Sequence, residues 1–316
     1  MRAILGIDAA WTPHNPSGVA LIRESSPGTW ECVALASSYE AFLAKADLKC
    51  AAATPHAVPV ADLLQAAEKL AGARLCLVSA DIPLSRQRIA GRRPADDEVS
   101  RSFGRCGCSA HTPSASRPGL IAEQIRGGFA RLGFALATYP QDLRDCALIE
   151  TYPHPALLAL MKVEYRVPYK VSKSRRYFPD LNLEQRFAQI AVKLGEIRTE
   201  LSRTISGVGL KIPDWPASLS ALKPIEDQLD ALVCAWVGIQ ALEGKATPLG
   251  DRNASIWVPT DSLDYARPKD WSAFLRSGAV ASKEFMQNVE DLPLQDREFF
   301  HTNSEVLAPR APRQRP

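Results

Sequence analysis

The sequence predicts an α/β fold: a mixed five-stranded sheet flanked by helices, followed by a C-terminal appendage. Short apolar runs that end in a carboxylate recur at residues 3–8, 75–81 and 146–150, which is typical of buried strands. Apolar side chains at helical spacing alternate with these runs in three segments: 60–71, 121–132 and 187–201. Strands that come first and then alternate with helices indicate a sheet whose functional edge lies at the carboxyl ends of its strands.

The remaining elements follow from local signals. Residues 19–22 and 30–35, separated by Pro27-Gly28, predict two further strands in a meander with the first. Pro224 is placed as the first residue of a late helix, and residues 256–258 form a last strand that closes the core. The Arg-, Gly-, Pro- and Ser-rich stretch 82–116 predicts a long loop. We expect one domain over 1–260 and an appendage over 261–316 that ends in a disordered basic tail.

Composition excludes several classes of protein. The 316 residues are 46% hydrophobic and 23% charged, as in ordinary globular proteins, and the net charge of +3 is too small for a polycation. No apolar run approaches the roughly 18 residues needed to span a bilayer, and Asp8 interrupts any secretory signal, so we expect a cytoplasmic protein without membrane contact. Cys106 and Cys108 lie near His111, but no second ligand pair follows at zinc-site spacing, which favours a structural loop.

Four aspartates form the candidate site. Asp8 and Asp81 each end an apolar strand, where a carboxylate is costly unless it is paired or binds a cation. Asp227 and Asp230 stand three residues apart on the late helix and project to one side. If the first and fourth strands are neighbours and this helix packs across them, the four carboxylates converge and suit Mg²⁺ or Mn²⁺. The alternative is that Asp227 and Asp230 only satisfy free amides at a helix start.

Several motifs resemble a known family, the domain of unknown function 429, identified as predicted ribonuclease-H-like nucleases. The resemblance covers about residues 1–260 and includes the opening Gly6-Ile7-Asp8 with Ser17-Gly18-Val19-Ala20. The other motifs that carry it are Asp81-Ile82-Pro83-Leu84, Gly91-Arg92-Arg93-Pro94-Ala95-Asp96, Phe103-Gly104, Cys108-Ser109-Ala110-His111-Thr112-Pro113, Glu150-Thr151-Tyr152-Pro153-His154-Pro155 and Asp227-Gln228-Leu229-Asp230-Ala231-Leu232. The Asp-x-x-Asp pair is also similar to the closing pair of Holliday-junction resolvases.

This resemblance implies a ribonuclease-H-like sheet and a nuclease that hydrolyses phosphodiester bonds with two Mg²⁺ or Mn²⁺ ions. In that mechanism Asp8 would bridge the ions, Asp81 would hold one, and Asp227 and Asp230 would hold the other. Glu150 is a further candidate catalytic residue. If it ends the fifth strand, it lies two strand spacings, roughly 10 Å, from Asp8, so we expect it to support the site or bind substrate.

Nucleic acid is the expected substrate, because two clusters of cations could hold phosphates. The loop after Asp81 contains Arg92 and Arg93 among six arginines, and residues 162–178 interleave Lys170, Lys173 and four other cations with aromatic residues. The alternative is that both clusters are solvated and ion-paired within the chain. His111 and His154 could bind substrate or move protons, although prolines on both sides of His154 are also typical of a turn.

Two rival functions come from different classes. A nucleotide-dependent phosphotransferase or ATPase of the actin-like fold would open with a similar Gly-x-Asp strand, but the chain has one such opening and no Walker-type glycine loop. A catalytically inactive nucleic-acid-binding module would not need four carboxylates together. Binding of ATP would favour the first rival, and failure to bind Mg²⁺ or Mn²⁺ would favour the second.

Overall fold

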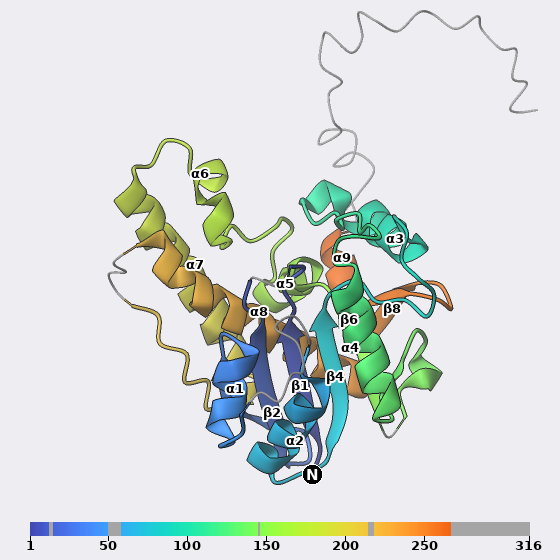
Figure 1. Cartoon of the computed structure of the whole chain (residues 1–316). Coiled ribbons are helices and arrows are strands. Elements are labelled where there is room, and N and C mark those ends of the chain that lie inside the picture. Colours follow the sequence, from blue (N-terminus) through green and yellow to red (C-terminus); the bar gives the residue numbers. More distant parts are fainter. Residues whose placement is uncertain (13–14, 50–57, 145, 214–217, 267–316) are drawn as a thin grey trace, which may run out of the picture. The chain divides into compact units, whose positions relative to one another are not determined.

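The computed structural model describes residues 1–12, 15–49, 58–144, 146–213 and 218–266 (Figure 1). Within this part, one nine-stranded mixed sheet forms the centre of the molecule. Its strands are β1 (Ala3–Asp8), β2 (Gly18–Ser26), β3 (Thr29–Ala36), β4 (Leu75–Asp81), β5 (Ala135–Leu136), β6 (Ala147–Thr151), β7 (Ile205–Ser206), β8 (Ala246–Gly250) and β9 (Ser255–Pro259).

The strand order is β7-β3-β2-β1-β4-β6-β9-β8, and β5 pairs with the edge of β6. β2 runs antiparallel to both β1 and β3, whereas β4 is parallel to β1, and β6 is parallel to β4. The expected adjacency of the first and fourth strands is therefore confirmed. The expected number of five strands is wrong. β5 and β7 are only two residues long and β8 contains Pro248, so none of these three strands shows a strand pattern in the sequence.

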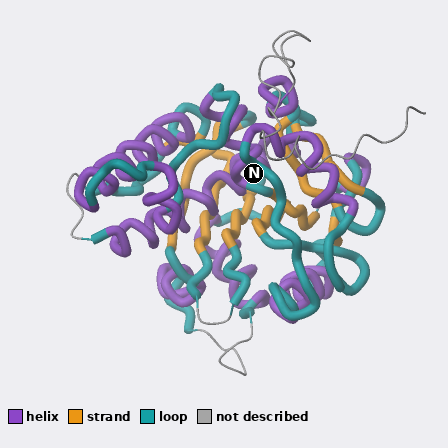
Figure 2. Tube along the Cα trace, turned by 90° about the horizontal axis from the view of Figure 1, so that it is seen from above, coloured by secondary structure: helices purple, strands orange, loops and turns teal. Residues whose placement is uncertain are grey.

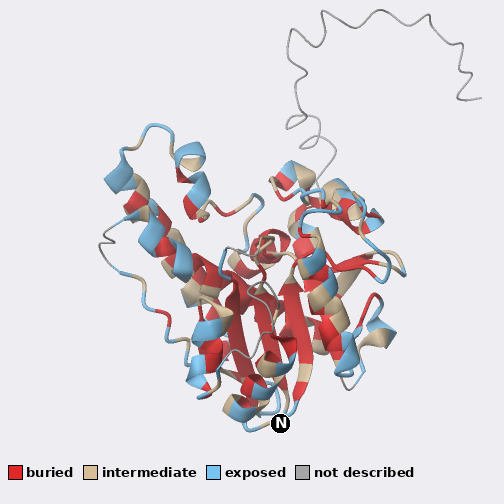
Figure 3. Cartoon of the chain, viewed as in Figure 1, coloured by how far each residue is buried: buried red, intermediate tan, exposed pale blue. Residues whose placement is uncertain are grey.

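Helices cover both faces of the sheet (Figures 1 and 2). One face packs against α1, α2 and α4, and the other against α5, α7 and α8, so that side chains alternate between the two cores along β1: Ile4 faces one, Leu5 the other. The sheet is buried and the outer helix faces are exposed (Figure 3). The helix bounds are α1 (Tyr39–Lys45), α2 (Val60–Ala71), α3 (Pro94–Phe103), α4 (Leu120–Arg131), α5 (Pro153–Met161), α6 (Ser174–Tyr177), α7 (Leu183–Leu201), α8 (Leu219–Leu242) and α9 (Ser262–Ala266).

The stretch expected as a long loop, 82–116, contains the ten-residue helix α3, so that expectation is wrong. Pro94 occupies the first helical position, where its missing N–H costs nothing, and the Asp96 side chain accepts a hydrogen bond from the Arg93 backbone N–H at 2.8 Å. Ala95, Val99 and Phe103, four residues apart, are buried. This four-residue apolar spacing is visible in the sequence, but the many polar residues around it favoured the prediction of a loop.

The helix α8 begins five residues before the predicted start. Ser218 caps it by accepting a hydrogen bond from the Ala221 backbone N–H, and Pro224 lies inside the helix instead of at its first position. Proline in a helix interior removes one backbone hydrogen bond, yet the buried stripe of α8 continues on both sides of it. Packing against the sheet therefore outweighs the local cost of Pro224.

The appendage expected over 261–316 lies mostly outside the described residues. Of this segment, only residues 261–266 are described: α9 and Asp261, which precedes it. The helix α9 packs against α5 and β9. The predicted disordered basic tail belongs to the undescribed part. None of the described helices combines the length and apolar character that crossing a membrane requires.

Two glycines let α8 lie directly on the sheet. A Cβ atom on Gly6 of β1 would lie 2.1 Å from the Ala231 carbonyl oxygen, and a Cβ atom on Gly18 of β2 would lie 2.0 Å from the Asp227 carbonyl oxygen. Both distances are far shorter than any non-bonded contact. Since Gly18 pairs with Asp8 across the strands, this close approach brings the Asp227 turn of α8 beside the end of β1.

A Gly18→Ala variant should therefore lose stability and displace Asp227 from the end of β1. Because the obstructing atom is backbone, the helix itself must move, and we expect a cost of at least about 1–3 kcal/mol. Urea denaturation measures it. Gly91→Ala is the matched control, since nothing lies within 4 Å of a Cβ atom at Gly91. Equal stability of the two variants would contradict the close approach of α8.

Candidate functional site

Asp8 and Asp81 lie side by side at the carboxyl ends of β1 and β4. They are register partners in this parallel pair, as the sequence predicted on condition that the two strands are neighbours. Burial raises the pKa of Asp8 well above its ordinary value, and the negative charge of Asp230 adds to this rise. Burial likewise raises the pKa of Asp81 to about 7. Both carboxylates thus lie where an additional cation would stabilise their charged form.

The helix α8 carries three more acids to this place: Glu226, Asp227 and Asp230, all buried. Asp227 is the ninth residue of the helix, beyond the first turn whose amides are free. The alternative that these aspartates cap a helix start is therefore wrong. Besides burial, the charges of Asp230, Asp81 and Asp227 raise the pKa of Asp8. Asp227 also lies against Gly18, the register partner of Asp8, so the predicted aspartates lie at the same end of the sheet.

Two lysines neutralise part of this acidic cluster. The ammonium group of Lys170 pairs with Asp230 and lies 3.4 Å from Glu226, and that of Lys223 pairs with Asp227 and lies 2.9 Å from Glu226. Burial lowers the pKa of Lys170, but the negative groups around it, Asp230 foremost together with Tyr169, Glu226 and Asp8, outweigh burial and raise this pKa well above its ordinary value. Lys170, expected among the phosphate-binding cations, lines both cavities and is also ion-paired within the acidic cluster.

The remaining oxygen of Asp230 is also engaged, because the Tyr169 hydroxyl donates a hydrogen bond to it at 2.5 Å. Among the described residues, the ion pairs of the cluster involve the acids of α8 and none involves Asp8 or Asp81. In this part of the chain no three His, Cys, Asp or Glu side chains are gathered as a ready metal site.

Glu150 belongs to a separate, buried ion-pair group. Its two oxygens accept hydrogen bonds from the Arg93 guanidinium at 2.6 and 2.7 Å, and Arg93 also binds Asp96 at 2.6 Å. Glu150 further accepts the Leu84 backbone N–H at 2.7 Å, so the group ties the segment after β4 to β6 and α3. β6 lies two strands from β1, as expected for Glu150. The guanidinium of Arg93 is thus engaged with carboxylates of its own chain.

Arg92 holds the backbone of the neighbouring loop in place. Its guanidinium pairs with Asp97 at 2.5 Å and donates hydrogen bonds to the Thr112 hydroxyl at 3.0 Å and the Ser100 hydroxyl at 2.7 Å. Ser100 in turn accepts the Ala110 backbone N–H at 3.1 Å. These contacts fix the position of His111, which is exposed and lies between Ala110 and Thr112.

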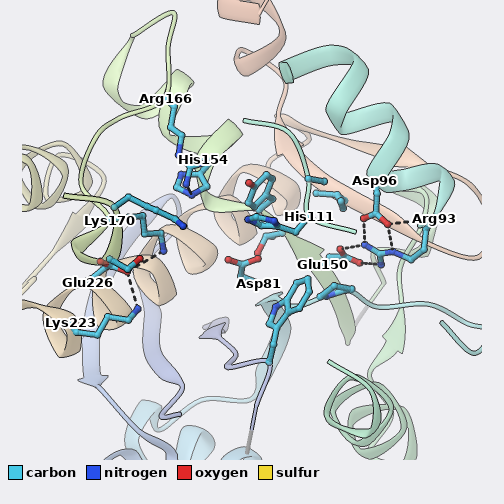
Figure 4. Close-up of a pocket in the computed structure, with 18 residues that line it drawn as sticks. Asp81, Arg93, Asp96, His111, Glu150, His154, Arg166, Lys170, Lys223 and Glu226 are labelled. Atoms are coloured by element: carbon cyan, nitrogen blue, oxygen red, sulfur yellow. Dashed lines mark hydrogen bonds and ion pairs between the residues drawn. The ribbon is translucent and has the colours of Figure 1, made fainter. Parts of the chain in front are cut away.

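Two adjoining cavities open around the acidic cluster. The first has a volume of about 270 Å³, and the second, about 590 Å³, reaches Asp8, Asp227 and Arg117. Five residues line both: Trp11, Asp81, His111, Lys170 and Lys223. Figure 4 shows the first cavity with Asp81 and His111 between the two ion-pair groups. Of the predicted substrate-binding residues, Arg93, His111, His154, Lys170 and Lys173 line this cavity, and Arg92 does not.

His154 lies at the wall of the first cavity beside Arg166. The Arg166 guanidinium donates to its Nε2 at 2.5 Å, which requires a neutral imidazole with its proton on Nδ1. Burial lowers the pKa of His154 well below its ordinary value, and the charges of Lys170 and Arg166 lower it further. A neutral ring at every physiological pH favours hydrogen bonding over proton transfer for His154.

Lys223 and Glu226 were missed by the sequence analysis. Both lie on the same face of α8 as Asp227 and Asp230, at the three- and four-residue spacings that a helix brings together. With the helix expected to start at Pro224, Lys223 lay outside it, so the three- and four-residue spacing from Lys223 to the acids did not indicate a contact. Tyr169 and Lys170 reach Asp230 across about sixty residues of sequence, and no local pattern indicates that contact.

A family model matches residues 6–254, and its description is "Protein of unknown function (DUF429)". The match covers well over half of the chain, and the chain therefore belongs to this family, as its motifs predicted. No curated protein and no solved structure matches the chain.

Proposed function

We propose that this protein is a metal-dependent nuclease with a ribonuclease-H-like fold, hydrolysing phosphodiester bonds with two divalent ions. The observation that carries the proposal is the side-by-side placement of Asp8 and Asp81, with Asp227 and Asp230 of α8 packed against the same strand ends. Carboxylates from different elements that meet in a cation-rimmed pocket suit phosphoryl chemistry.

The strand arrangement supports the fold assignment. The five strands β3-β2-β1-β4-β6 are contiguous, with only β2 reversed, and the first acid ends the first strand, as the family resemblance implies. The flanking strands β7, β8 and β9 extend this core at both edges. The site lies at the carboxyl ends of the parallel strands, where α/β sheets commonly bind ligands.

The donor set fits Mg²⁺ or Mn²⁺. All the candidate ligands are carboxylate oxygens, and the five acids of the cluster outnumber its two lysines, so charge is left to be balanced. Asp8 and Asp81 would hold the metal directly. Asp227 and Asp230 would also bind it, and would then lose their ion pairs with Lys223 and Lys170. The bound ions would activate a water molecule and neutralise the leaving oxygen.

The chain's own cations would place the substrate. Lys170 and Lys223 line both cavities beside the carboxylates, and Arg117 lines the second cavity. In this position their charges attract a phosphodiester backbone toward the acidic cluster, which would otherwise repel it. Trp11, which lines both cavities, offers an aromatic face to a base.

Metal affinity should increase with pH. Because burial raises the pKa of Asp81 to about 7, most of this carboxyl is protonated at pH 6 and must release its proton before it binds a cation. One such group predicts about tenfold tighter Mn²⁺ binding at pH 8 than at pH 6. Calorimetric titration at the two pH values measures the difference, and unchanged or weaker binding at pH 8 would contradict the assignment of Asp81 as a ligand.

A panel of labelled nucleic acids tests the function itself. Single strands, duplexes and four-way junctions of DNA and RNA are incubated with Mn²⁺ and either the wild-type protein or an Asp8→Asn variant. We expect the wild-type protein to cleave at least one member and the variant to cleave none. Equal cleavage by both proteins would identify a contaminant, and binding of ATP without cleavage would favour the phosphotransferase.

A further inference from the structure

The first cavity contains positive charge that no carboxylate of the described chain neutralises. Its acids are accounted for: Asp96 and Glu150 pair with Arg93, and Glu226 pairs with the two lysines of the cluster. Only Asp81, the proposed metal ligand, remains. Arg166 and Lys173 line the same cavity and have no ion pair with any described residue.

Two buried hydrogen-bond donors of residues that line the cavity also lack a partner. The Nε–H of Arg166 and the Nδ1 of His154, which carries the ring proton, are both buried without a partner among the described groups. His154 itself is only 5% exposed. A buried donor without a partner is unfavourable, and an acceptor atom supplied by a ligand would remove that cost.

His111 also lines the cavity, beside Asp81 and between the two ion-pair groups (Figure 4). Partial desolvation lowers the pKa of His111, and the positive charges of Arg166, Lys173 and Arg117 lower it further. A neutral imidazole can donate one hydrogen bond without adding charge. The wall therefore offers Arg166, Lys173, His111 and His154 to one anionic group.

The rest of the cavity is aromatic and small. Trp11 and Tyr152 line it, and the Tyr152 ring packs edge-on against His154, with ring centres 5.3 Å apart. The volume of about 270 Å³ lies just below the roughly 300–1,000 Å³ of drug-sized ligand pockets, which suits one small unit and excludes a base-paired helix. Aromatic rings beside an anion site are the usual arrangement for an unstacked base with its phosphate.

We propose that this cavity binds a single unpaired nucleotide, its phosphate held by Arg166 and Lys173 with the two histidines, and its base against Trp11 and Tyr152. This inference rests on the proposed function for the role of the neighbouring carboxylates, and it specifies the substrate: a nucleic acid with an unpaired nucleotide next to the bond that is cut. Asp81 lines both cavities, so this nucleotide lies directly beside the proposed metal site.

The test measures binding of AMP to the full chain in EDTA, by calorimetry, where no metal-dependent cleavage occurs. We expect AMP to bind at least about tenfold more tightly than adenosine, because the phosphate provides charge-assisted hydrogen bonds. Arg166→Gln and Lys173→Gln should each weaken AMP binding by at least about fivefold. Arg175→Gln is the matched control, since Arg175 is an exposed cation of the same segment that does not line the cavity.

A single-stranded oligonucleotide should displace AMP, and the same strand in a duplex should not. The inference is overturned if AMP and adenosine bind alike, if Arg175→Gln weakens AMP binding as much as Lys173→Gln does, or if the duplex displaces AMP equally well. Lys173 is exposed and unpaired in the described chain, so its variant is expected to fold even if Arg166→Gln does not. AMP binding is measured without metal, so a failure to bind AMP would not contradict Mn²⁺-dependent cleavage. Likewise, an absence of cleavage would not contradict AMP binding.

Discussion

An Asp8→Asn variant is expected to lose nuclease activity and measurable Mn²⁺ binding. Asp8 lies between Asp81, its strand neighbour, and the acids of α8, so it is the carboxylate best placed to serve more than one ion. Asparagine keeps the size of the side chain and removes its charge. Loss of a partner outside the ligand set typically costs roughly 10–100-fold, so loss of a direct ligand should exceed about 100-fold in both affinity and rate. Calorimetric Mn²⁺ titration and single-turnover cleavage measure the two effects.

Asp180→Asn provides the matched control, because Asp180 is exposed and lies outside both cavities. The same change of charge there should leave metal binding and cleavage within about twofold of the wild-type protein, as is usual for surface substitutions. Asp8→Asn should also be more stable than the wild-type protein in EDTA, because it removes one of several like charges that are close together. Retention of Mn²⁺ binding by Asp8→Asn would exclude Asp8 as a ligand.

An Arg93→Met variant is expected to lose about 3–5 kcal/mol of folding stability. Its guanidinium makes ion pairs with Glu150 and Asp96 and also donates to the Leu84 carbonyl at 2.7 Å, all in a buried setting. Methionine fills much of the same space but leaves two buried carboxylates without a cation. Chemical denaturation with guanidinium chloride or urea measures the loss through the shift in the transition midpoint.

Arg88→Met is the control for this variant, since Arg88 is an exposed arginine of the same segment. It should change the free energy of unfolding by no more than about 0.5 kcal/mol. If Arg93→Met were as stable as Arg88→Met, the buried ion-pair group would contribute nothing to the fold. In that case Arg93 would again be available as a cation for the substrate, as the sequence analysis expected.

Strand-end acids were the most informative feature of the sequence. Asp8 and Asp81 follow apolar runs that can only be buried strands, and an acid at such a position needs a cation or a partner. Whether the two acids are adjacent depended on the strand order, and the pairing of β1 with β4 confirms that they are. Asp227 and Asp230 were predicted to share a side of a helix, and they do, although the helix begins well before the predicted residue. Local periodicity was sufficient for these features because each depends on neighbours within a few residues.

The cations could not be assigned in the same way. Lys170, Lys173 and Arg93 all lie in basic segments and look alike in the sequence. In the structure Lys170 pairs with Asp230, Arg93 pairs with Glu150, and Lys173 has no carboxylate partner among the described residues. These pairs join residues about sixty positions apart in the sequence. Which carboxylate each cation contacts therefore depends on which strands and helices pack together. The helix α3, which carries Asp96 to Arg93, was itself hidden in a polar segment.

The sequence by itself determined the α/β class, the central strands and the family, and it indicated four aspartates as candidates for the site, since apolar periodicity and strand-end charges are local properties of the chain. Only the tertiary structure decided that Lys170 and Lys223 neutralise the acids of α8, that Arg93 is tied to Glu150, and that Arg166 and Lys173 remain open to a ligand. The reason is physical: a long, flexible cation takes whichever carboxylate the packing brings within a few ångströms, and that choice is made between elements remote in the chain.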